Sequence, residues 1–326
     1  MKRRVYFSAI LSFIVFSFLF LPFSLTADSR KEKISSRCGE CSSTIDRRLF
    51  YRLENKGFYC SKKCAEKAQY KLLPKCSVCK TPAQRFWFIN HSKEKRCDKC
   101  KDLPRCAFCK NYAKKKTPGN RFLCNTCSKT AIHDHQKAFA LFRSLRKTLQ
   151  YTLGIATDHS IAFSLDTPSS MEKKKGSKLD RGQTGLFIHR TQIQKEVKYD
   201  RRTGRTISRK VKVTDETYSI SILYSLPFPE YRYTVIHELT HDWMSAHFRH
   251  ITDLKTKEGV SEYISWLFLK NDPEATPYNA MICSNLEKNP DPVYGEGFRM
   301  IRKIAGTGDA QSCIARLKKY LSGRKK

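Results

Sequence analysis

The chain has 326 residues, enough for two ordinary domains, and 40% of them are hydrophobic, which excludes a chain too small or too polar to bury a core. It carries 63 Lys and Arg against 30 Asp and Glu, a formal net charge of +33. Such a charge predicts attraction to a polyanion, whether nucleic acid, anionic lipid or an acidic protein surface, and does not choose among them.

The first predicted element is an apolar N-terminal segment. Arg3 and Arg4 precede a run, residues 5–27, that holds no charge. A basic start followed by an apolar run is typical of a secretory signal peptide, and Leu25-Thr26-Ala27 offers a small residue for cleavage. The run also approaches the length of about 20 residues that spans a bilayer, so an uncleaved membrane anchor or a buried core helix are alternatives. We expect an exported chain: periplasmic, secreted, or anchored and facing outside the cytoplasm.

Twelve of the fourteen cysteines form three consecutive units, each made of two close pairs. They are Cys38, Cys41, Cys60 and Cys64 in the first unit, Cys76, Cys79, Cys97 and Cys100 in the second, and Cys106, Cys109, Cys124 and Cys127 in the third. Repeated close pairs are typical of structural zinc sites, in which four thiolates surround one ion and leave no open position. We therefore predict about three structural Zn²⁺ in residues 28–131. Disulfides, which an oxidising compartment favours, are the alternative, and they are also open to Cys283 and Cys313.

The cysteine units resemble known zinc modules. Segments 57–67 and 121–127 resemble treble-clef fingers, in which the last two ligands lie at the start of a short helix. Paired modules resemble the LIM domain, but eleven residues separate Cys64 from Cys76, so the region is LIM-like only. We expect these modules to dock a partner or substrate. Nucleic-acid binding is less favoured, although residues 114–116 and Arg121 would suit phosphates.

Residues 132–326 are predicted to form a second domain that begins with an amphipathic linker helix from His135 to Gly154. The elements expected after it are a loop at residues 167–182, a strand at 186–189, a basic hairpin at 197–213, a strand at 217–226 and a helix from about Tyr231 to His250. The strand at 217–226 is expected to border the active-site cleft and to pair with an extended substrate.

The helix from Tyr231 carries an HExxH motif at residues 237–241. His237 and His241 are one helical turn apart on one face, so both can bind one zinc ion, and Glu238 can act as general base on a bound water. Glu258, seventeen residues after His241, opens an apolar helix and supplies the third ligand of an open catalytic site. Glu262, one turn further, can accept a hydrogen bond from a zinc-bound histidine.

In their order along the chain, these motifs resemble those of the LIM-domain, ubiquitin-activated zinc peptidases that limit organ size in plants. The matching segments are 222–227, 237–244, 258–259 and 292–299. The resemblance implies an α+β, gluzincin-type peptidase domain behind LIM-like modules, with one catalytic zinc and protein substrates. It makes His237, His241 and Glu258 the ligands and Glu238 the base. The chain departs from the family in its export signal and in having no ubiquitin-interacting helices ahead of the cysteines.

Peptide hydrolysis also requires a group besides zinc that stabilises the developing oxyanion. Tyr294 is our candidate, with His247, His250 and Tyr278 as alternatives. The expected function is thus an exported zinc metallopeptidase acting on proteins. The alternatives are a non-catalytic zinc-finger protein with a degenerate peptidase fold, which binds nucleic acid or a protein partner, and an amidase acting on bacterial cell-wall peptides.

Overall fold

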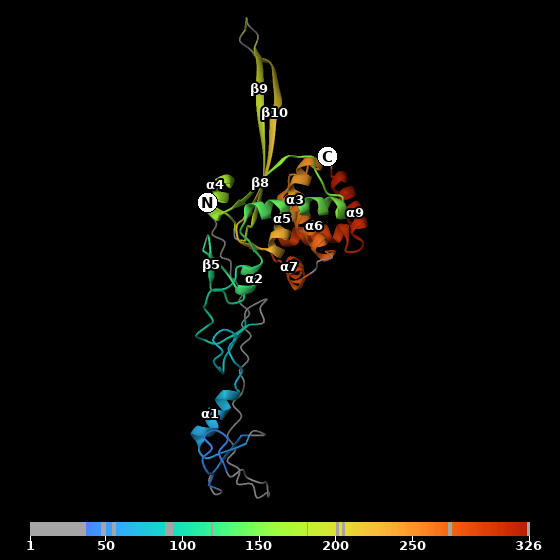
Figure 1. Cartoon of the computed structure of the whole chain (residues 1–326). Helices are drawn as coiled ribbons and strands as arrows, with labels where there is room; N and C mark the ends of the chain where they lie inside the picture. Colours follow the sequence, from blue (N-terminus) through green and yellow to red (C-terminus); the bar gives the residue numbers. More distant parts are fainter. Residues whose placement is uncertain are drawn as a thin grey trace. The chain divides into compact units, whose positions relative to one another are not determined.

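A computed structural model of the chain describes residues 37–46, 50–53, 57–88, 94–118, 120–180, 182–199, 202–203, 206–272 and 276–324. These residues form a mixed α+β structure, which confirms that part of the expected fold class. The chain divides into two compact units, Met1–Ala113 and Lys114–Lys326 (Figure 1). The expected signal peptide or anchor, residues 1–27, lies outside the described residues. None of the helices in the described part is long and apolar enough to cross a membrane.

The first unit is built from short elements placed around cysteines. Strands β1 (Tyr51–Leu53) and β2 (Gly57–Tyr59) pair antiparallel and are followed by helix α1 (Lys62–Leu72), and strands β3 (Trp87–Phe88) and β4 (Lys95–Arg96) pair in the same way. Cysteine side chains belong to both small hydrophobic clusters described in this unit. The unit therefore has no large apolar core in its described residues.

The second unit contains the longer elements. Its helices are α2 (Asn125–Lys129), α3 (His135–Leu153), α4 (Pro168–Lys175), α5 (Phe228–His247), α6 (Leu254–Lys270), α7 (Pro277–Glu287), α8 (Tyr294–Ala305) and α9 (Ala310–Gly323). Its strands are β5 (Lys115–Thr117), β6 (Arg121–Leu123), β7 (Ala131–Ile132), β8 (Ile161–Asp166), β9 (Gly185–Tyr199), β10 (Thr206–Leu223) and β11 (Leu226–Pro227). The linker helix is confirmed as α3, which ends at Gly154 in the left-handed conformation with φ 61°.

Strand β10 is the centre of a three-stranded sheet, with β8 parallel on one side and β9 antiparallel on the other. Beyond the part that pairs with β8, β9 and β10 continue as a two-stranded ribbon that extends away from the helices (Figure 1). Residues 190–196 of β9 are all exposed on this ribbon. The predicted hairpin at 197–213 is confirmed, because Tyr199 of β9 pairs with Thr206 of β10 and the pairing continues from there. The prediction of a separate strand at 217–226 was wrong, because β10 continues through a bulge between Val213 and Asp215 without ending.

The predicted loop at residues 167–182 was also wrong in part, because it contains helix α4. Thr167 caps the helix by accepting a hydrogen bond from the Ser170 amide at 3.3 Å, and Pro168 occupies its first turn. Met171 of this helix is fully buried, and Gly176 ends the helix with φ 76°. These capping residues favour a helix here, although its last turn, residues 173–175, consists of lysines.

The core of the second unit lies between α5, α6 and α8. Trp266, Tyr231, Tyr263 and Phe298 are among its fully buried side chains. Helix α5 begins at Phe228, three residues before the predicted start, because prolines are tolerated in the first turn of a helix. Figure 1 shows α5 and α6 among the other helices rather than at the edge of the unit. Side chains on their facing surfaces are therefore held by packing on several sides.

Helices α6 and α8 cross at two glycines. A Cβ on Gly259 would lie 2.5 Å from the backbone of Gly297, and a Cβ on Gly297 would lie 2.5 Å from the Lys255 carbonyl oxygen. Only hydrogen fits at these two positions, so the helix backbones can approach in van der Waals contact. The crossing brings the N-terminal turn of α8, with Tyr294, next to the helix that carries Glu258.

Candidate metal centres

The twelve predicted cysteine ligands gather into three groups of four, each able to hold a metal ion. Within each group the four sulfur atoms lie within 4.8 Å of one another. In the first group the Sγ atoms of Cys41 and Cys60 are 3.5 Å apart and those of Cys60 and Cys64 are 3.7 Å apart. These separations far exceed a disulfide bond of about 2.05 Å, and none of the fourteen cysteines, Cys283 and Cys313 included, is in a disulfide.

The second cysteine pair of the first and third groups lies where a short hairpin meets a short helix. In the first group, Ser61 caps α1 and accepts a hydrogen bond from the Cys64 amide at 3.2 Å. In the third group, Cys124 itself caps α2 and its sulfur accepts from the Cys127 amide at 3.4 Å.

In the first two cysteine groups, neighbouring groups lower the pKa of some thiols and raise that of others. Burial opposes ionisation of Cys38, but backbone amides that donate to its sulfur outweigh this effect and lower its pKa to about 6. A hydrogen bond from the Thr81 hydroxyl and one from its amide lower the pKa of Cys79 to about 6. Burial and the neighbouring thiolates raise the pKa of Cys100 to about 12. Four thiolates can therefore coexist only if a cation lies among them.

A fourth group combines side chains from α5 and α6. The Nε2 atoms of His237 and His241 are 3.1 Å apart, and the Oε2 atom of Glu258 lies 3.2 Å from the first and 3.4 Å from the second. The three atoms thus form a nearly equilateral triangle that can hold one metal ion. The two histidines are adjacent because they are one turn apart on α5, and Glu258 reaches them because α6 packs against that face.

The site lies in a cavity of about 830 Å³, and Glu238 lines it with the three triangle residues. Burial raises the pKa of Glu238, against the effect of the neighbouring histidines and of a hydrogen bond from the Phe187 amide. Gly185 on β9 leaves room for this carboxylate, because a Cβ there would collide with Glu238 and lie 2.6 Å from the Thr234 methyl group. A carboxylate with a raised pKa beside a metal-type triangle has the position and basicity of a general base.

Polar side chains lie behind both histidine rings. An oxygen of Glu262 lies 4.0 Å from His237 Nδ1, and the Tyr233 hydroxyl donates a 2.6 Å hydrogen bond to the other oxygen. Ser261 Oγ lies 3.3 Å from His241 Nδ1. The sequence predicted a hydrogen bond from a histidine ring to Glu262, but His237 Nδ1 has no hydrogen-bond partner among the described residues and the Glu262 oxygen is 4.0 Å away. Neither Ser261 nor Tyr233 was singled out from the sequence. Tyr233 precedes His237 by four residues, so helical spacing could have indicated it.

The buried histidines and carboxylates of this site strongly influence one another's ionisation. Burial disfavours the imidazolium of His237, but its hydrogen bond to Glu258 and the carboxylates of Glu262 and Glu238 raise its pKa to about 9. Burial disfavours the carboxylate of Glu258, but hydrogen bonds to His237 and His241 lower its pKa well below the usual range. The cluster thus attracts positive charge, and a divalent cation would satisfy it more fully than a proton.

Tyr294 lines the same cavity, at the first residue of α8. Burial and the nearby carboxylate of Glu258 raise the pKa of its phenol, so the hydroxyl is a proton donor rather than a phenolate. Two of the alternatives lie elsewhere: His247 Nε2 is 3.1 Å from the Ala156 carbonyl oxygen, and His250 Nε2 is 3.0 Å from that of Leu321. Neither they nor Tyr278 lines the cavity.

The strand that borders the cavity is β9 rather than the predicted segment 217–226. Residues 185–187 of β9 line the cavity, whereas 217–223 form the C-terminal part of β10, which lies between β8 and β9. A central strand has no backbone groups free for a ligand, whereas β9 is an edge strand in the described sheet. Sequence alternation finds a strand but does not give its position in the sheet.

Comparisons of the chain with protein-family models, curated proteins and solved structures find no match.

Proposed function

We propose that the chain is a zinc metallopeptidase that hydrolyses peptide bonds of protein substrates. The observation that carries the proposal is the triangle of His237, His241 and Glu258 with the Glu238 carboxylate in the same cavity. A tetrahedral zinc ion with bonds of about 2.0–2.1 Å to nitrogen or oxygen requires donor atoms about 3.3–3.4 Å apart. The three observed separations, 3.1, 3.2 and 3.4 Å, fit this requirement and leave the fourth position for water.

The surrounding residues supply the other parts of a hydrolytic site. A bound zinc ion would polarise the scissile carbonyl and lower the pKa of its water. Glu238 takes the proton of the attacking water and transfers it to the leaving amine. The Tyr294 hydroxyl donates to the oxyanion as it develops. The edge of β9 at residues 185–187 can pair with an extended peptide and align its backbone across the cavity.

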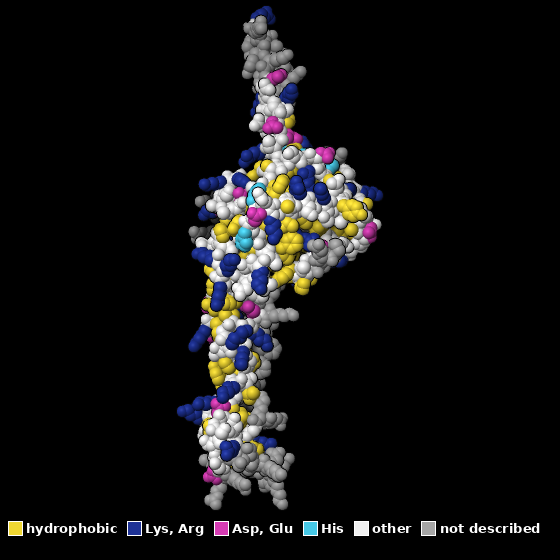
Figure 2. All heavy atoms as spheres, viewed as in Figure 1, with side chains coloured by type: hydrophobic (Ala, Val, Ile, Leu, Met, Phe, Trp, Pro, Cys, Tyr) yellow, Lys and Arg dark blue, Asp and Glu magenta, His cyan; other side chains and the backbone are white. Residues whose placement is uncertain are grey.

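We propose structural zinc for the three cysteine groups. Zn–S bonds of about 2.3 Å place sulfur atoms about 3.8 Å apart in a tetrahedron. The sulfur–sulfur separations of 3.5 Å for Cys41 and Cys60 and 3.7 Å for Cys79 and Cys97 are close to that edge. These LIM-like modules would dock a substrate or an acidic partner of the basic chain. Figure 2 shows Lys and Arg side chains spread over the visible face rather than collected in one patch, so the charge favours no single partner. Export directed by residues 1–27 completes the proposal.

Two other functions fit parts of the chain. A zinc-finger binding protein with an inactive peptidase fold would have no need of Glu238, which is nevertheless buried in the cavity with all three triangle residues. An amidase acting on cell-wall peptides would use the same metal chemistry. It differs from the main proposal only in substrate, so assays with both substrate classes separate the two.

The deciding experiment compares Glu238→Gln with Glu258→Ala, using an unfolded protein as substrate and measuring zinc content. Glu238→Gln should keep the ion and lose about 10²–10⁴-fold in turnover, because it removes only the base. Glu258→Ala should lose the zinc ion of this site as well as activity. Glu196→Gln, the same change on the exposed ribbon, is the matched control and should leave both unchanged. Full activity of Glu238→Gln, or no turnover by the unmodified chain on any peptide, would refute the proposal.

A further inference from the structure

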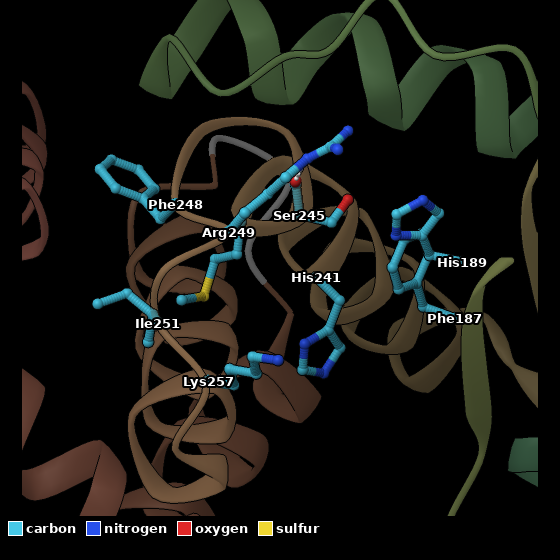
Figure 3. Close-up of a pocket in the computed structure, with 9 residues that line it drawn as sticks. Phe187, His189, His241, Ser245, Phe248, Arg249, Ile251 and Lys257 are labelled. Carbon is cyan, nitrogen blue, oxygen red and sulfur yellow. Dashed lines mark hydrogen bonds between the residues drawn. The ribbon is translucent and has the colours of Figure 1, made fainter. Parts of the chain in front are cut away.

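A second cavity, of about 310 Å³, lies directly beside the metal triangle. Phe187, His241 and Lys257 line both this cavity and the larger one, so the two are neighbouring parts of one cleft. Figure 3 shows it between Phe187 and His189 on one side and Phe248 and Ile251 on the other. A side chain next to the scissile bond of a peptide held at the metal would therefore enter this smaller cavity.

The inner wall of the smaller cavity is apolar. Met244, Phe248 and Ile251 contribute to it, and all three are buried in the second unit. Phe187, from the edge strand β9, closes it on the side of the larger cavity. Such a wall favours the methylene or aliphatic part of a side chain, because its burial removes apolar surface from water.

Most polar groups on the rim are already paired. Arg249 makes two 2.9 Å hydrogen bonds to the carboxylate of Glu216, and Figure 3 shows its guanidinium directed away from the His241 ring. The Ser245 hydroxyl donates to the Asp242 carbonyl oxygen at 2.7 Å. These groups are therefore not available to recognise a charged ligand without breaking contacts within the protein.

Lys257 is different. Its ammonium has no hydrogen-bond or ion-pair partner among the residues that the structure describes, although the side chain is half-buried. Figure 3 shows the ammonium directed towards the His241 ring, and Lys257 lines both cavities. Lys255, on the same helix, instead makes a 2.6 Å ion pair with Glu296. A partly buried cation without a partner is the group that an anionic ligand would complete.

We propose that the smaller cavity binds a carboxylate-bearing residue of the substrate, with the apolar wall holding its aliphatic part and Lys257 its carboxylate. This inference rests on the proposed peptidase function and adds the substrate class. The carboxylate can belong to an acidic side chain beside the scissile bond or to the C-terminus of a substrate cut near its end. Both sources present the same chemistry to Lys257.

Binding of metal-directed probes tests the cavity without requiring turnover. Two hydroxamates of equal length, one ending in a carboxylate and one in the corresponding amide, would be titrated calorimetrically into the full-length, zinc-loaded protein. We expect the carboxylate probe to bind about tenfold more tightly, as expected for a hydrogen bond to a charged group. Lys257→Met should remove the preference and Lys257→Glu should reverse it. Lys255→Met, the matched control, should keep it.

Peptide cleavage then separates the two sources of the carboxylate. One peptide series varies an internal residue next to the scissile bond between Glu and Gln, and a second carries either a free or an amidated C-terminus. Loss of the Glu preference in Lys257→Met identifies the side chain, and loss of the free-terminus preference identifies the C-terminus. Equal binding of the two hydroxamates by the unmodified protein, or an unchanged preference in Lys257→Met, would overturn the inference. Discrimination between the probes without cleavage of any peptide would instead refute the peptidase proposal and leave the anion site standing.

Discussion

The cysteine modules and the His237 site both collect metal-type ligands, but the amount of structure that supports the ligands differs greatly. In the first unit, buried cysteines are themselves members of the small hydrophobic clusters, such as Cys76, Cys97 and Cys100 in one of them. In the second unit, the three triangle residues project from two long helices that are buried along most of their length. An ion in the modules would thus replace a core, whereas an ion at the His237 site would be added to a core that already exists.

The strongest test of this comparison is removal of metal from the full chain by a chelator. Structural zinc contributes about 10–16 kcal/mol to the folding of zinc-finger peptides, so the modules should unfold when it is removed. Helices α5 and α6 should keep their structure because their core contains no metal. Hydrogen exchange measured by mass spectrometry should show fast exchange in residues 57–72 and retained protection in residues 256–269.

The control for this experiment is re-addition of zinc, which should restore protection in residues 57–72. Equal loss of protection in both regions would show that the second unit also depends on metal for its fold. Retained protection in the modules, with thiols that no longer react, would instead favour oxidised cysteines.

A smaller effect is expected from Gly259→Ala at the crossing of α6 and α8. The added methyl group would lie 2.5 Å from the Gly297 backbone, which cannot move aside as a flexible side chain can. Overpacking of this kind costs about 1–3 kcal/mol, and the melting temperature of the second unit should fall accordingly. Gly308→Ala is the matched control, because nothing lies within 4 Å of its added Cβ. An unchanged melting temperature would mean that the two helices are not in close contact.

The smallest expected effect separates the ligands from the groups behind them. Glu262→Gln keeps the shape of the side chain but weakens its interaction with His237 Nδ1, 4.0 Å away. Changes behind metal ligands typically reduce metal affinity or activity by about 10–100-fold. Zinc competition titrations should therefore show weaker binding at this site with the cysteine groups unaffected. If Glu262→Gln released the ion as completely as Glu258→Ala, Glu262 would be a ligand itself.

The candidate ligands also differ in how well the sequence predicts them. The cysteine groups could be predicted because a repeated spacing of two or three residues fixes both members of each pair on one short turn. The pair His237 and His241 could be predicted for the same local reason. Glu258 required an argument about a second helix, whose start at Leu254 lies four residues before the predicted one, because Asp253 caps it.

What could not be predicted depends on contacts between distant segments. Ser261 lies next to His241, and β9 rather than β10 borders the cavity, only because of how α5, α6 and the sheet pack together. Lys257 is adjacent to Glu258 in sequence, but nothing in the sequence shows that its ammonium lacks a partner whereas that of Lys255 has one. Such differences arise from tertiary packing, which local patterns do not encode.

The length of the ribbon formed by β9 and β10 sets the distance between its tip and the metal cavity. Ile220 and Phe187 pair at its base beside the metal cavity, whereas Val213 and Ile193 pair further out, each with 51% of its surface exposed. Because each residue adds about 3.3 Å and side chains alternate between faces, removing two residues from each outer strand would shorten the ribbon by about 7 Å and leave every remaining side chain on its present face. Removing one residue from each strand would instead move the side chains beyond the deletion to the opposite face of the ribbon. Anything that the tip touches can therefore be brought closer to the cavity only in steps of two residues.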